Sequence, residues 1–138
     1  MPVEQTLILA KPDAVRRSLT GEIVARFERR GFRLRAARLL TVDRALAQEH
    51  YAEHEAKPFF GELVEFITSG PTLAFVLEGK GVIATARTTI GATNPADAVP
   101  GSLRGDFASA MPDNLVHGSD SPESAAREIA LWFPDGLV

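Results

Sequence analysis

Asn114-Leu115-Val116-His117-Gly118-Ser119-Asp120-Ser121 places a histidine between a short apolar step and a polar turn. The Leu115-Val116 step is suited to a brief buried strand, and Gly118 lets the backbone turn sharply or lets a ligand approach closely. Ser121 is a favourable helix N-cap, and Pro122 is a favourable first residue of the helix that follows. The stretch therefore predicts an imidazole that is held still and exposed between a strand and a helix.

The helix after this turn is predicted to bury one face, because apolar residues recur in it at helical spacing. These residues are Ala125, Ala126, Ile129, Ala130 and Phe133. Glu128 lies on the same helix beside the apolar stripe. From there its carboxylate can turn back to hydrogen-bond His117 or Ser119, which is the usual way in which a nucleophilic or basic histidine is oriented.

Length and composition restrict the class of protein. A chain of 138 residues is long enough for one domain with one core, which we expect to span residues 1–138. A formal charge of -3 gives no bulk attraction to nucleic acid or to an anionic membrane, so any phosphate-binding surface must be local. With no cysteine, disulfides and thiolate chemistry are excluded, and histidine and carboxylates are the conventional metal ligands that remain.

The N-terminal residues Met1 to Gln5 lack the order of a signal peptide. No apolar run approaches the roughly 20 residues that a helix needs to span a bilayer. We therefore expect a cytoplasmic protein without a membrane segment.

Hydrophobic periodicity predicts alternating strands and helices. Strands are expected at residues 3–10, 32–42 and 72–78. Helices are expected at residues 20–30, from Asp43 through His54, at 61–69, at 81–90 and after Ser121. The first strand reads as buried on both faces and the second as half-buried, with its arginines outward. Residues 91–113 lack periodicity, and loops of that length in compact domains are usually functional or disordered.

Lys11 stands where the first strand ends, and such strand ends face ligands in open α/β sheets. A lysine at that point can place a positive charge on a phosphate. The alternative is a surface lysine whose stem covers apolar atoms while its ammonium group stays in water.

Two arginines and a threonine lie close in sequence to the histidine segment. Arg87 precedes the long loop, and Thr93 and Arg104 lie within it. They offer hydrogen-bond donors to an anionic ligand. The alternative is that each arginine pairs with a nearby carboxylate such as Asp97 or Asp106.

Lys57-Pro58-Phe59-Phe60 interrupts the helical region in the middle of the chain. Two adjacent phenylalanines after a proline cannot easily face the same way. We expect one of them to pack in the core, which leaves the other free to stack on a base.

Two further motifs are weak. His50-Tyr51-Ala52-Glu53-His54 matches the H-x-x-E-H zinc pattern, but no third ligand is evident and such residues are ordinary on a solvated helix face. The segment at 79–84 matches the dinucleotide fingerprint, but too few strand-helix alternations follow it to build the required parallel sheet. We interpret its glycines as a turn into a helix.

Taken together, these segments resemble the nucleoside diphosphate kinase family. The resemblance runs from about Thr6 to Phe133 and is carried most specifically by N-x-x-H-G-S-D at 114–120. The other matching segments are Lys11-Pro12-Asp13, His50-Tyr51, Lys57-Pro58-Phe59-Phe60, Gly-x-Thr-Asn-Pro at 91–95, and Pro100-Gly101-x-x-Arg104-Gly105-Asp106-Phe107.

The resemblance implies an α+β fold, a ferredoxin-like βαββαβ sandwich with an antiparallel four-stranded sheet. It also implies helices over one face and an inserted helical hairpin around residues 43–68. The implied reaction passes the γ-phosphoryl group of a nucleoside triphosphate, such as ATP or GTP, to His117 and from there to a nucleoside diphosphate. The implied cofactor is Mg²⁺, held on the nucleotide phosphates without a direct protein ligand.

The resemblance also implies a role for each matching site residue. His117 would accept the phosphoryl group, Glu128 would hold its other ring nitrogen, and Ser119 would support Glu128. The phosphates would be surrounded by Lys11, Tyr51, Arg87, Thr93 and Arg104. The nucleoside would be held by Asn114 with Lys11 at the ribose, by Phe59 stacked on the base, and by Leu63.

Departures from the family pattern are few: Ser102-Leu103 before Arg104, and an end of the chain soon after Trp132-Phe133-Pro134. We expect a homo-oligomer and favour a hexamer of three dimers, with a tetramer or dimer as alternatives. A P-loop kinase is excluded because the G-x-x-x-x-G-K-[ST] sequence is absent. The other hypothesis is a regulatory protein of this fold that signals through phospho-His117 or binds nucleic acid. The complete set of polar residues favours the enzyme, and the acidic charge disfavours nucleic acid as an obligatory partner.

Overall fold

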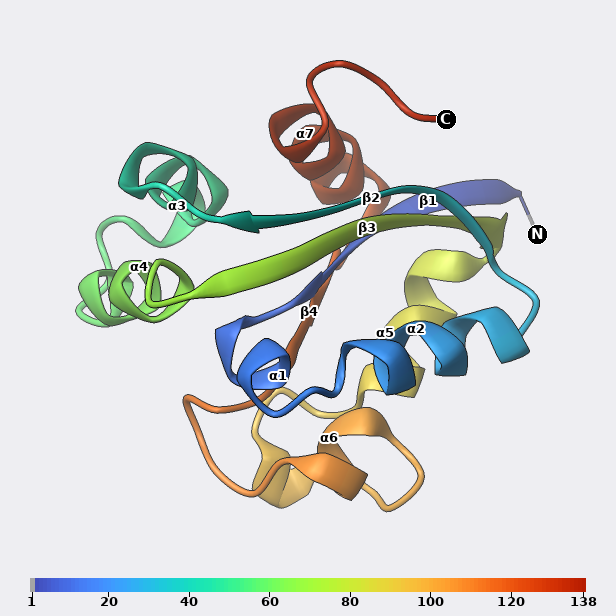
Figure 1. The fold of residues 1–138 in the computed structure, drawn as a ribbon, viewed down its shortest axis with the longest axis horizontal. Helices are drawn as coiled ribbons and strands as arrows, with labels where there is room; N and C mark the ends of the chain where they lie inside the picture. The colour runs from blue at the N-terminus through green and yellow to red at the C-terminus, as the bar shows by residue number, and fades with distance from the viewer. Residues whose placement is uncertain (1) are drawn as a thin grey trace.

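The computed structural model describes residues 2–138, and the sheet at its centre has four antiparallel strands in the order β2-β3-β1-β4 (Figure 1). The strands are β1 (Val3–Ala10), β2 (Arg33–Thr41), β3 (Pro71–Lys80) and β4 (Val116–Gly118). Helix α2 (Thr20–Arg29) connects β1 to β2, and α5 (Val82–Ile90) connects β3 to β4. This is the expected ferredoxin-like βαββαβ arrangement.

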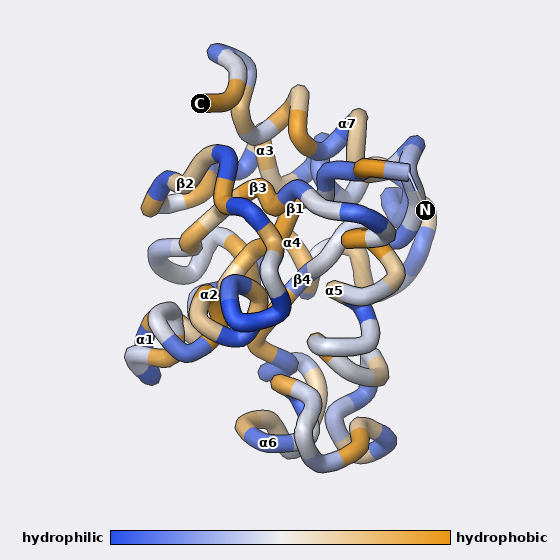
Figure 2. The backbone as a smooth tube through the Cα atoms, turned by 90° about the vertical axis from the view of Figure 1, so that its right-hand side faces the viewer, coloured by the Kyte–Doolittle hydropathy of each residue, from blue (hydrophilic) through white to orange (hydrophobic). Residues whose placement is uncertain are grey.

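Strand β1 lies between β3 and β4, and its side chains from Thr6 to Ala10 are fully buried. Because side chains alternate along a strand, Ile8 and Ala10 enter one core while Leu7 and Leu9 enter another. Apolar residues, orange in Figure 2, therefore gather along the central strands. The burial of β1 on both faces is confirmed.

The sheet is covered by helices on both faces, so the expectation of helices over one face was wrong (Figure 1). Helices α2 and α5 cover the face of Ile8 through Phe27 and Ala86. The other face is covered by α3 (Arg44–His50), α4 (Phe60–Ile67) and α7 (Pro122–Trp132). The second layer exists because the inserted helices and the terminal helix carry apolar residues that need burial, such as Ile67 and Trp132.

The inserted helical pair is confirmed, but α3 ends at His50 and does not continue as an α-helix through His54. A short 3-10 turn, Ala52–His54, follows it. Arg127 of α7 donates to the carbonyls of Glu49 at 3.0 Å and His50 at 3.1 Å. These bonds satisfy carbonyl groups at the helix end, so the α-helix has no need of another turn.

Strand β2 is more exposed than a half-buried strand, because it is an edge strand with an irregular register. Leu34 lies opposite Leu77, but Ala36 lies opposite Val76, so one residue is inserted between them. Leu34 is 40% exposed and Leu39 is 63% exposed. The predicted alternation of buried leucines and outward arginines is therefore wrong.

Two short helices escaped the sequence analysis: α1 (Pro12–Arg16), and α6 (Leu103–Phe107) within the segment that lacked periodicity. That segment also holds a 3-10 turn, Pro95–Asp97. Each of these elements is five residues or fewer, which is too short to show a helical period. Ser102 caps α6 by accepting a hydrogen bond from the amide of Gly105.

Strand β4 begins one residue later than predicted. Leu115 is fully buried but has φ of 69°, a left-handed conformation that a strand does not accommodate. After Gly118 the chain enters α7, and Ser121 accepts a hydrogen bond from the amide of Ser124 at 3.1 Å, as its N-cap position predicted. None of the helices described in residues 2–138 is long and apolar enough to cross a membrane.

Candidate active site

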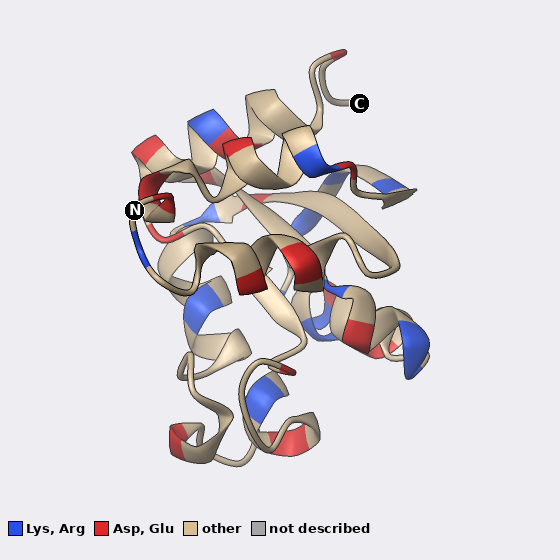
Figure 3. Cartoon of the chain, turned by 90° about the vertical axis from the view of Figure 1, so that its left-hand side faces the viewer, with Lys and Arg blue, Asp and Glu red and all other residues tan. Residues whose placement is uncertain are grey.

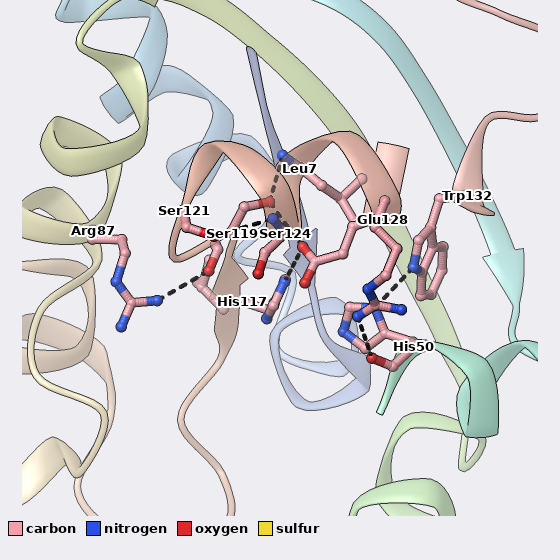
Figure 4. A network of polar contacts seen from close by, with 12 residues as sticks. Leu7, His50, Arg87, His117, Ser119, Ser121, Ser124, Glu128 and Trp132 are labelled. Atoms are coloured by element: carbon pink, nitrogen blue, oxygen red, sulfur yellow. Dashed lines mark hydrogen bonds and ion pairs between the residues drawn. The ribbon is translucent and has the colours of Figure 1, made fainter. Parts of the chain in front are cut away.

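His117 projects from β4, where its backbone lies opposite Leu9 of β1. Its Nε2 lies 2.9 Å from Oε1 of Glu128, and the hydroxyl of Ser119 donates to the same oxygen at 2.8 Å (Figure 4). Because an ionised carboxylate only accepts, Nε2 carries the proton and Nδ1 keeps its lone pair. Both contacts predicted for Glu128 are present.

The charge on Glu128 is maintained by its hydrogen bonds. Burial opposes that charge, but the hydrogen bonds from His117 and from the Ser119 hydroxyl help to outweigh the burial and hold the pKa of Glu128 below its usual value. Glu128 is therefore an anion positioned to stabilise positive charge on the His117 ring.

Ser119 connects this pair to the central strand. Its hydroxyl accepts a hydrogen bond from the amide of Leu7 at 3.1 Å, and its own amide donates to the Leu7 carbonyl at 3.2 Å. Ser119 is completely buried. The orientation of Glu128 is therefore tied to β1, a central strand whose residues from Thr6 to Ala10 are fully buried.

Arg87 and Arg104 are anchored by backbone carbonyls. Arg87 donates to the carbonyl of Gly118 at 3.1 Å. Arg104 donates to three carbonyls, those of Asn114 at 3.0 Å, Gly91 at 3.0 Å and Val116 at 2.5 Å.

The alternative in which these arginines pair with Asp97 or Asp106 is wrong. Asp106 instead pairs with Arg26 at 2.7 Å, and neither Arg87 nor Arg104 forms a salt bridge within residues 2–138. Their charges remain available to an anion.

Lys11 is buried, so the alternative of a snorkelling surface lysine is also wrong. Its ammonium group donates to Oδ1 of Asn114. Burial lowers the pKa of Lys11 to about 8, Asp13 opposes the change, and the positive charge of Arg104 adds to it. Burial, followed by the charge of Arg87, likewise lowers the pKa of Arg104 to about 10. Three cations thus lie close enough to repel one another, and a bound polyphosphate would relieve that repulsion.

These side chains line one cavity of about 630 Å³. The predicted residues that line it are Lys11, Tyr51, Phe59, Leu63, Arg87, Thr93, Arg104, Asn114 and His117. Glu128 and Ser119 lie behind His117 and do not line this cavity. The side chains predicted from separate segments of the sequence are therefore brought together.

The aromatic pair is divided as expected. Phe59 is 43% exposed at the cavity, and Phe60 packs against the core that contains Trp132. Asn114 donates its side-chain amide to the Thr93 carbonyl at 2.9 Å, which ties two lining residues of the cavity together.

Several lining residues were missed by the sequence analysis. They are His54, Glu62, Phe66, Met111, Pro112 and Val116. Gly118, which was predicted to let a ligand approach closely, also lines the cavity. Phe66 follows Phe59 by seven positions and Leu63 by three, so helical spacing on α4 was a signal for it. Asp13 was quoted but given no role; its carboxylate accepts from the amide of Leu115 at 2.9 Å and so supports the turn before β4.

A metal ion does not fit the histidine cluster. One ligand atom from each of His50, His117 and Glu128 lies within 4.8 Å of the others. However, Nδ1 of His50 accepts a hydrogen bond from the indole of Trp132 at 3.0 Å, so the other nitrogen of the neutral ring carries the proton. The H-x-x-E-H pattern is divided between two elements, because α3 ends at its first histidine.

Comparison with known proteins agrees with this geometry. The family model described as Nucleoside diphosphate kinase matches residues 4–138. A nucleoside diphosphate kinase of Brevibacillus brevis is 60% identical over 131 residues, covering 95% of this chain and 89% of that protein. Nucleoside diphosphate kinase 1 of Spinacia oleracea is 58% identical over 136 residues, covering 99% of this chain and 92% of that protein.

A solved structure is also closely similar in fold. The halophilic nucleoside diphosphate kinase of Halobacterium salinarum in complex with CDP superposes with a TM-score of 0.95 at 47% identity, covering 99% of this chain and 92% of that one. The family model spans nearly the whole chain, and the relatives exceed half identity over almost their full length. This chain belongs to the nucleoside diphosphate kinase family.

Proposed function

We propose that this protein transfers the γ-phosphoryl group of a nucleoside triphosphate to a nucleoside diphosphate, with His117 as the intermediate carrier. The observation that carries the proposal is the 2.9 Å contact between Nε2 of His117 and Glu128. Glu128 engages Nε2, so the lone pair of Nδ1 is free, and His117 lines the same cavity as Lys11, Arg87 and Arg104.

In the first half-reaction, the lone pair of Nδ1 forms a bond to the γ-phosphorus while the bond from phosphorus to the bridging oxygen breaks. The nucleoside diphosphate leaves with that electron pair. The ring becomes positively charged, and the Glu128 carboxylate stabilises it through the Nε2 proton, which stays on the ring.

In the second half-reaction, a terminal oxygen of another nucleoside diphosphate attacks the same phosphorus. The bond to Nδ1 breaks and the neutral imidazole is restored. Because one site serves both nucleotides in turn, the kinetics are of the ping-pong type.

The cations supply the electrostatic part of catalysis. Lys11, Arg87 and Arg104 offset the charge on the oxygens of the transferring group, and Tyr51 and Thr93 lie at the same cavity as hydroxyl donors. The carbonyl anchors of the arginines keep them in place before the nucleotide arrives, which lowers the reorganisation that binding requires.

The nucleoside would be held at the other end of the cavity. Phe59 would stack on the base, with Leu63 beside it, and Asn114 with Lys11 would contact the ribose hydroxyls. Stacking accepts the face of any base, so both purine and pyrimidine nucleotides fit.

Mg²⁺ fits this cavity only as an ion carried by the nucleotide. The lining holds three cationic side chains and a single carboxylate, that of Glu62, which is a poor donor set for an ion that prefers several oxygens. When bound to the phosphates, the ion supplies further neutralisation of their charge.

The test of the function is an initial-rate study with labelled ATP and a nucleoside diphosphate, both varied. Ping-pong transfer gives parallel lines in double-reciprocal plots and exchange of label between ATP and ADP without a second nucleotide. Intersecting lines together with no exchange would contradict the proposal, because they indicate direct transfer in a ternary complex.

We also propose that the protein forms a homo-oligomer, with a hexamer favoured. The support is strand β2, a sheet edge whose Leu34 and Leu39 are exposed. A cytoplasmic location and independence from nucleic acid remain predictions. On the side of the molecule shown in Figure 3, acidic and basic residues are interspersed, which is not the single-sign surface typical of a nucleic-acid site.

A further inference from the structure

His50 makes the closest aromatic contact to the proposed nucleophile, yet neither the sequence motifs nor the phosphoryl transfer gives it a role. Its ring lies 4.7 Å from the ring of His117, centroid to centroid, at an angle of 77° (Figure 4). His50 is the last residue of α3 and is only 3% exposed. Tyr51, at 4.8 Å, and Trp132, at 5.5 Å, enclose the same ring.

The protonation state of His50 is fixed by Trp132. The indole Nε1 is a donor that cannot accept, and it lies 3.0 Å from Nδ1 of His50. A proton on Nδ1 would break this hydrogen bond and leave the buried indole N–H unpaired. His50 is therefore a neutral ring with its proton on Nε2.

Taken together, the charges around His50 also lower its pKa and so favour the neutral ring. The groups that face His50 are His117 from β4, Glu128 and Arg127 from α7, and Lys11 from the end of β1. Burial is the main cause that lowers the pKa of His50 to about 3; the positive groups add to it and Glu128 opposes it. No charge develops on His50 at neutral pH.

Helix α7 controls both neighbours of the nucleophile. Glu128 and Trp132 are four residues apart and so lie on one face of α7. Arg127 fixes the end of α3 by donating to the carbonyls of Glu49 and His50. One helix thus holds the hydrogen-bond partner of His117 and also sets the position of His50.

We propose that His50 is a positioning residue that holds the plane of the His117 ring by a perpendicular contact from a neutral imidazole. This inference rests on the proposed function of His117. One hydrogen bond from Nε2 to Glu128 does not by itself fix the plane of the His117 ring. The buried His50 ring, packed perpendicular to the His117 ring, prevents that plane from rotating. A neutral neighbour also does not oppose the positive charge that forms on His117 during transfer, as an imidazolium 4.7 Å away would.

Two variants separate the contact between the His50 and His117 rings from the Trp132 hydrogen bond that fixes the protonation state of His50. In His50→Asn, the amide oxygen can take the place of Nδ1 as acceptor for Trp132, but the part of the ring that meets His117 is lost. In Trp132→Phe, most of the apolar volume is kept while the donor that fixes the His50 tautomer is lost. Val42→Ala is the matched control, because Val42 lies in the same core and contacts neither the cavity nor His117 in the described contacts.

The measurements are the single-turnover rate of His117 phosphorylation by labelled ATP with Mg²⁺, the Kd for ADP, and the His117 tautomer by long-range ¹H–¹⁵N NMR of the nucleotide-free protein. For His50→Asn we expect phosphorylation slower by about tenfold, since small misplacements of a reacting group cost that much or more. We expect its Kd for ADP to stay within about twofold, and its His117 signals to show a mixture of tautomers or increased exchange.

For Trp132→Phe, burial still keeps His50 neutral, so the ring loses only the donor that fixes its tautomer. We expect NMR to show mixed His50 tautomers, and phosphorylation to be slower than in the native protein but faster than in His50→Asn. Val42→Ala should leave rate, affinity and tautomer unchanged within about twofold. If His50→Asn is poorly folded, the phosphorylation rate and NMR signals of Trp132→Phe decide alone.

The inference is overturned if His50→Asn is phosphorylated at the native rate with an unchanged His117 tautomer, or if Trp132→Phe keeps the native phosphorylation rate although its His50 tautomers are mixed. If the native protein takes no label, the proposed function fails separately. In that case the NMR comparison of native and His50→Asn proteins still decides whether His50 orders the His117 ring.

Discussion

Individual side chains at this site act through fixed neighbours, and His117 is the clearest example. Glu128 holds its Nε2 edge, Ser119 donates to Glu128, and Ser119 is bonded to the backbone of Leu7. The sequence was sufficient to predict these residues, because a polar motif and one helical register place them. It was not sufficient to give Asp13 or His50 a role, since their partners Leu115 and Trp132 lie 102 and 82 positions away in the chain.

Replacing Glu128 by alanine tests the orientation of the nucleophile. We expect kcat to fall by about 100-fold, the cost of misplacing a reacting group by about 1 Å, because the Nε2 edge loses its acceptor. The Kd for ADP should stay within about twofold, since Glu128 does not line the nucleotide cavity. Stopped-flow phosphorylation and calorimetric ADP titration measure the two quantities. An equal loss of rate and affinity would show that Glu128 acts on the nucleotide itself.

Lys11 predicts a pH dependence of nucleotide affinity. Its pKa is lowered to about 8 in the nucleotide-free protein, so its positive charge is present at pH 7 and is lost as the pH rises through 8. ADP affinity should therefore weaken between pH 7 and pH 9.5. Calorimetric titration of native protein and Lys11→Met checks this: the variant should bind more weakly at pH 7 and lose little more at higher pH. A parallel decline in both proteins would assign the effect to another group.

At the scale of elements, helix α5 and strands β1 and β3 agree with the sequence, because each carries a clear apolar period or an apolar run. Helix α7 lies where it was predicted, but its predicted buried face is wrong in part: Ala126 and Ala130 are exposed, because the helix turns Glu128 and Trp132 inward toward His117 and His50. Strand β2 does not, since its inserted residue interrupts the alternation and its edge position leaves leucines exposed. Helices α1 and α6 were invisible because each is little more than one turn long. Periodicity reveals an element only when the element is long enough to repeat and packs against one continuous surface.

The N-cap of α7 predicts a change in stability without a change in chemistry. Ser121 accepts a hydrogen bond from the amide of Ser124, and its replacement by alanine should lower the free energy of unfolding by about 1 kcal/mol. The phosphorylation rate should stay within about twofold, because Arg127 and Trp132 still fix the rest of the helix to α3. Urea unfolding measures the first quantity. A rate loss as large as that of Glu128→Ala would mean that the cap itself sets the helix register.

For the whole molecule, the two-sided sheet brings the site residues together from β1, the inserted helices, α5, the long loop and β4. The sequence predicted these residues as one site only through the family resemblance. Their grouping in three dimensions follows from the burial of both faces of β1. The expectation of helices over one face of the sheet was wrong, because the helices of the second layer are an insertion in the βαββαβ core and a terminal extension of it.

The exposed edge of the sheet predicts self-association. Leu39 and Val3 are both 63% exposed, but only Leu39 lies on the edge strand β2. Leu39→Lys should reduce the mass measured by light scattering toward the 14.9 kDa of a single chain, because a charge replaces apolar contact area. Val3→Lys is the matched control and should keep the native mass. Equal masses for native protein and Leu39→Lys would exclude this edge as the contact.

The phosphoryl carrier is tested most directly by trapping it. Native protein is mixed with ATP labelled on the γ-phosphoryl group and with Mg²⁺, and a nucleoside diphosphate is added to half of each sample before quenching. If His117 is the carrier, the native protein holds a label that is stable in alkali, lost in acid and discharged by the nucleoside diphosphate, and His117→Ala holds none. An unlabelled native protein, or a label that persists in His117→Ala, would contradict phosphoryl transfer through this histidine.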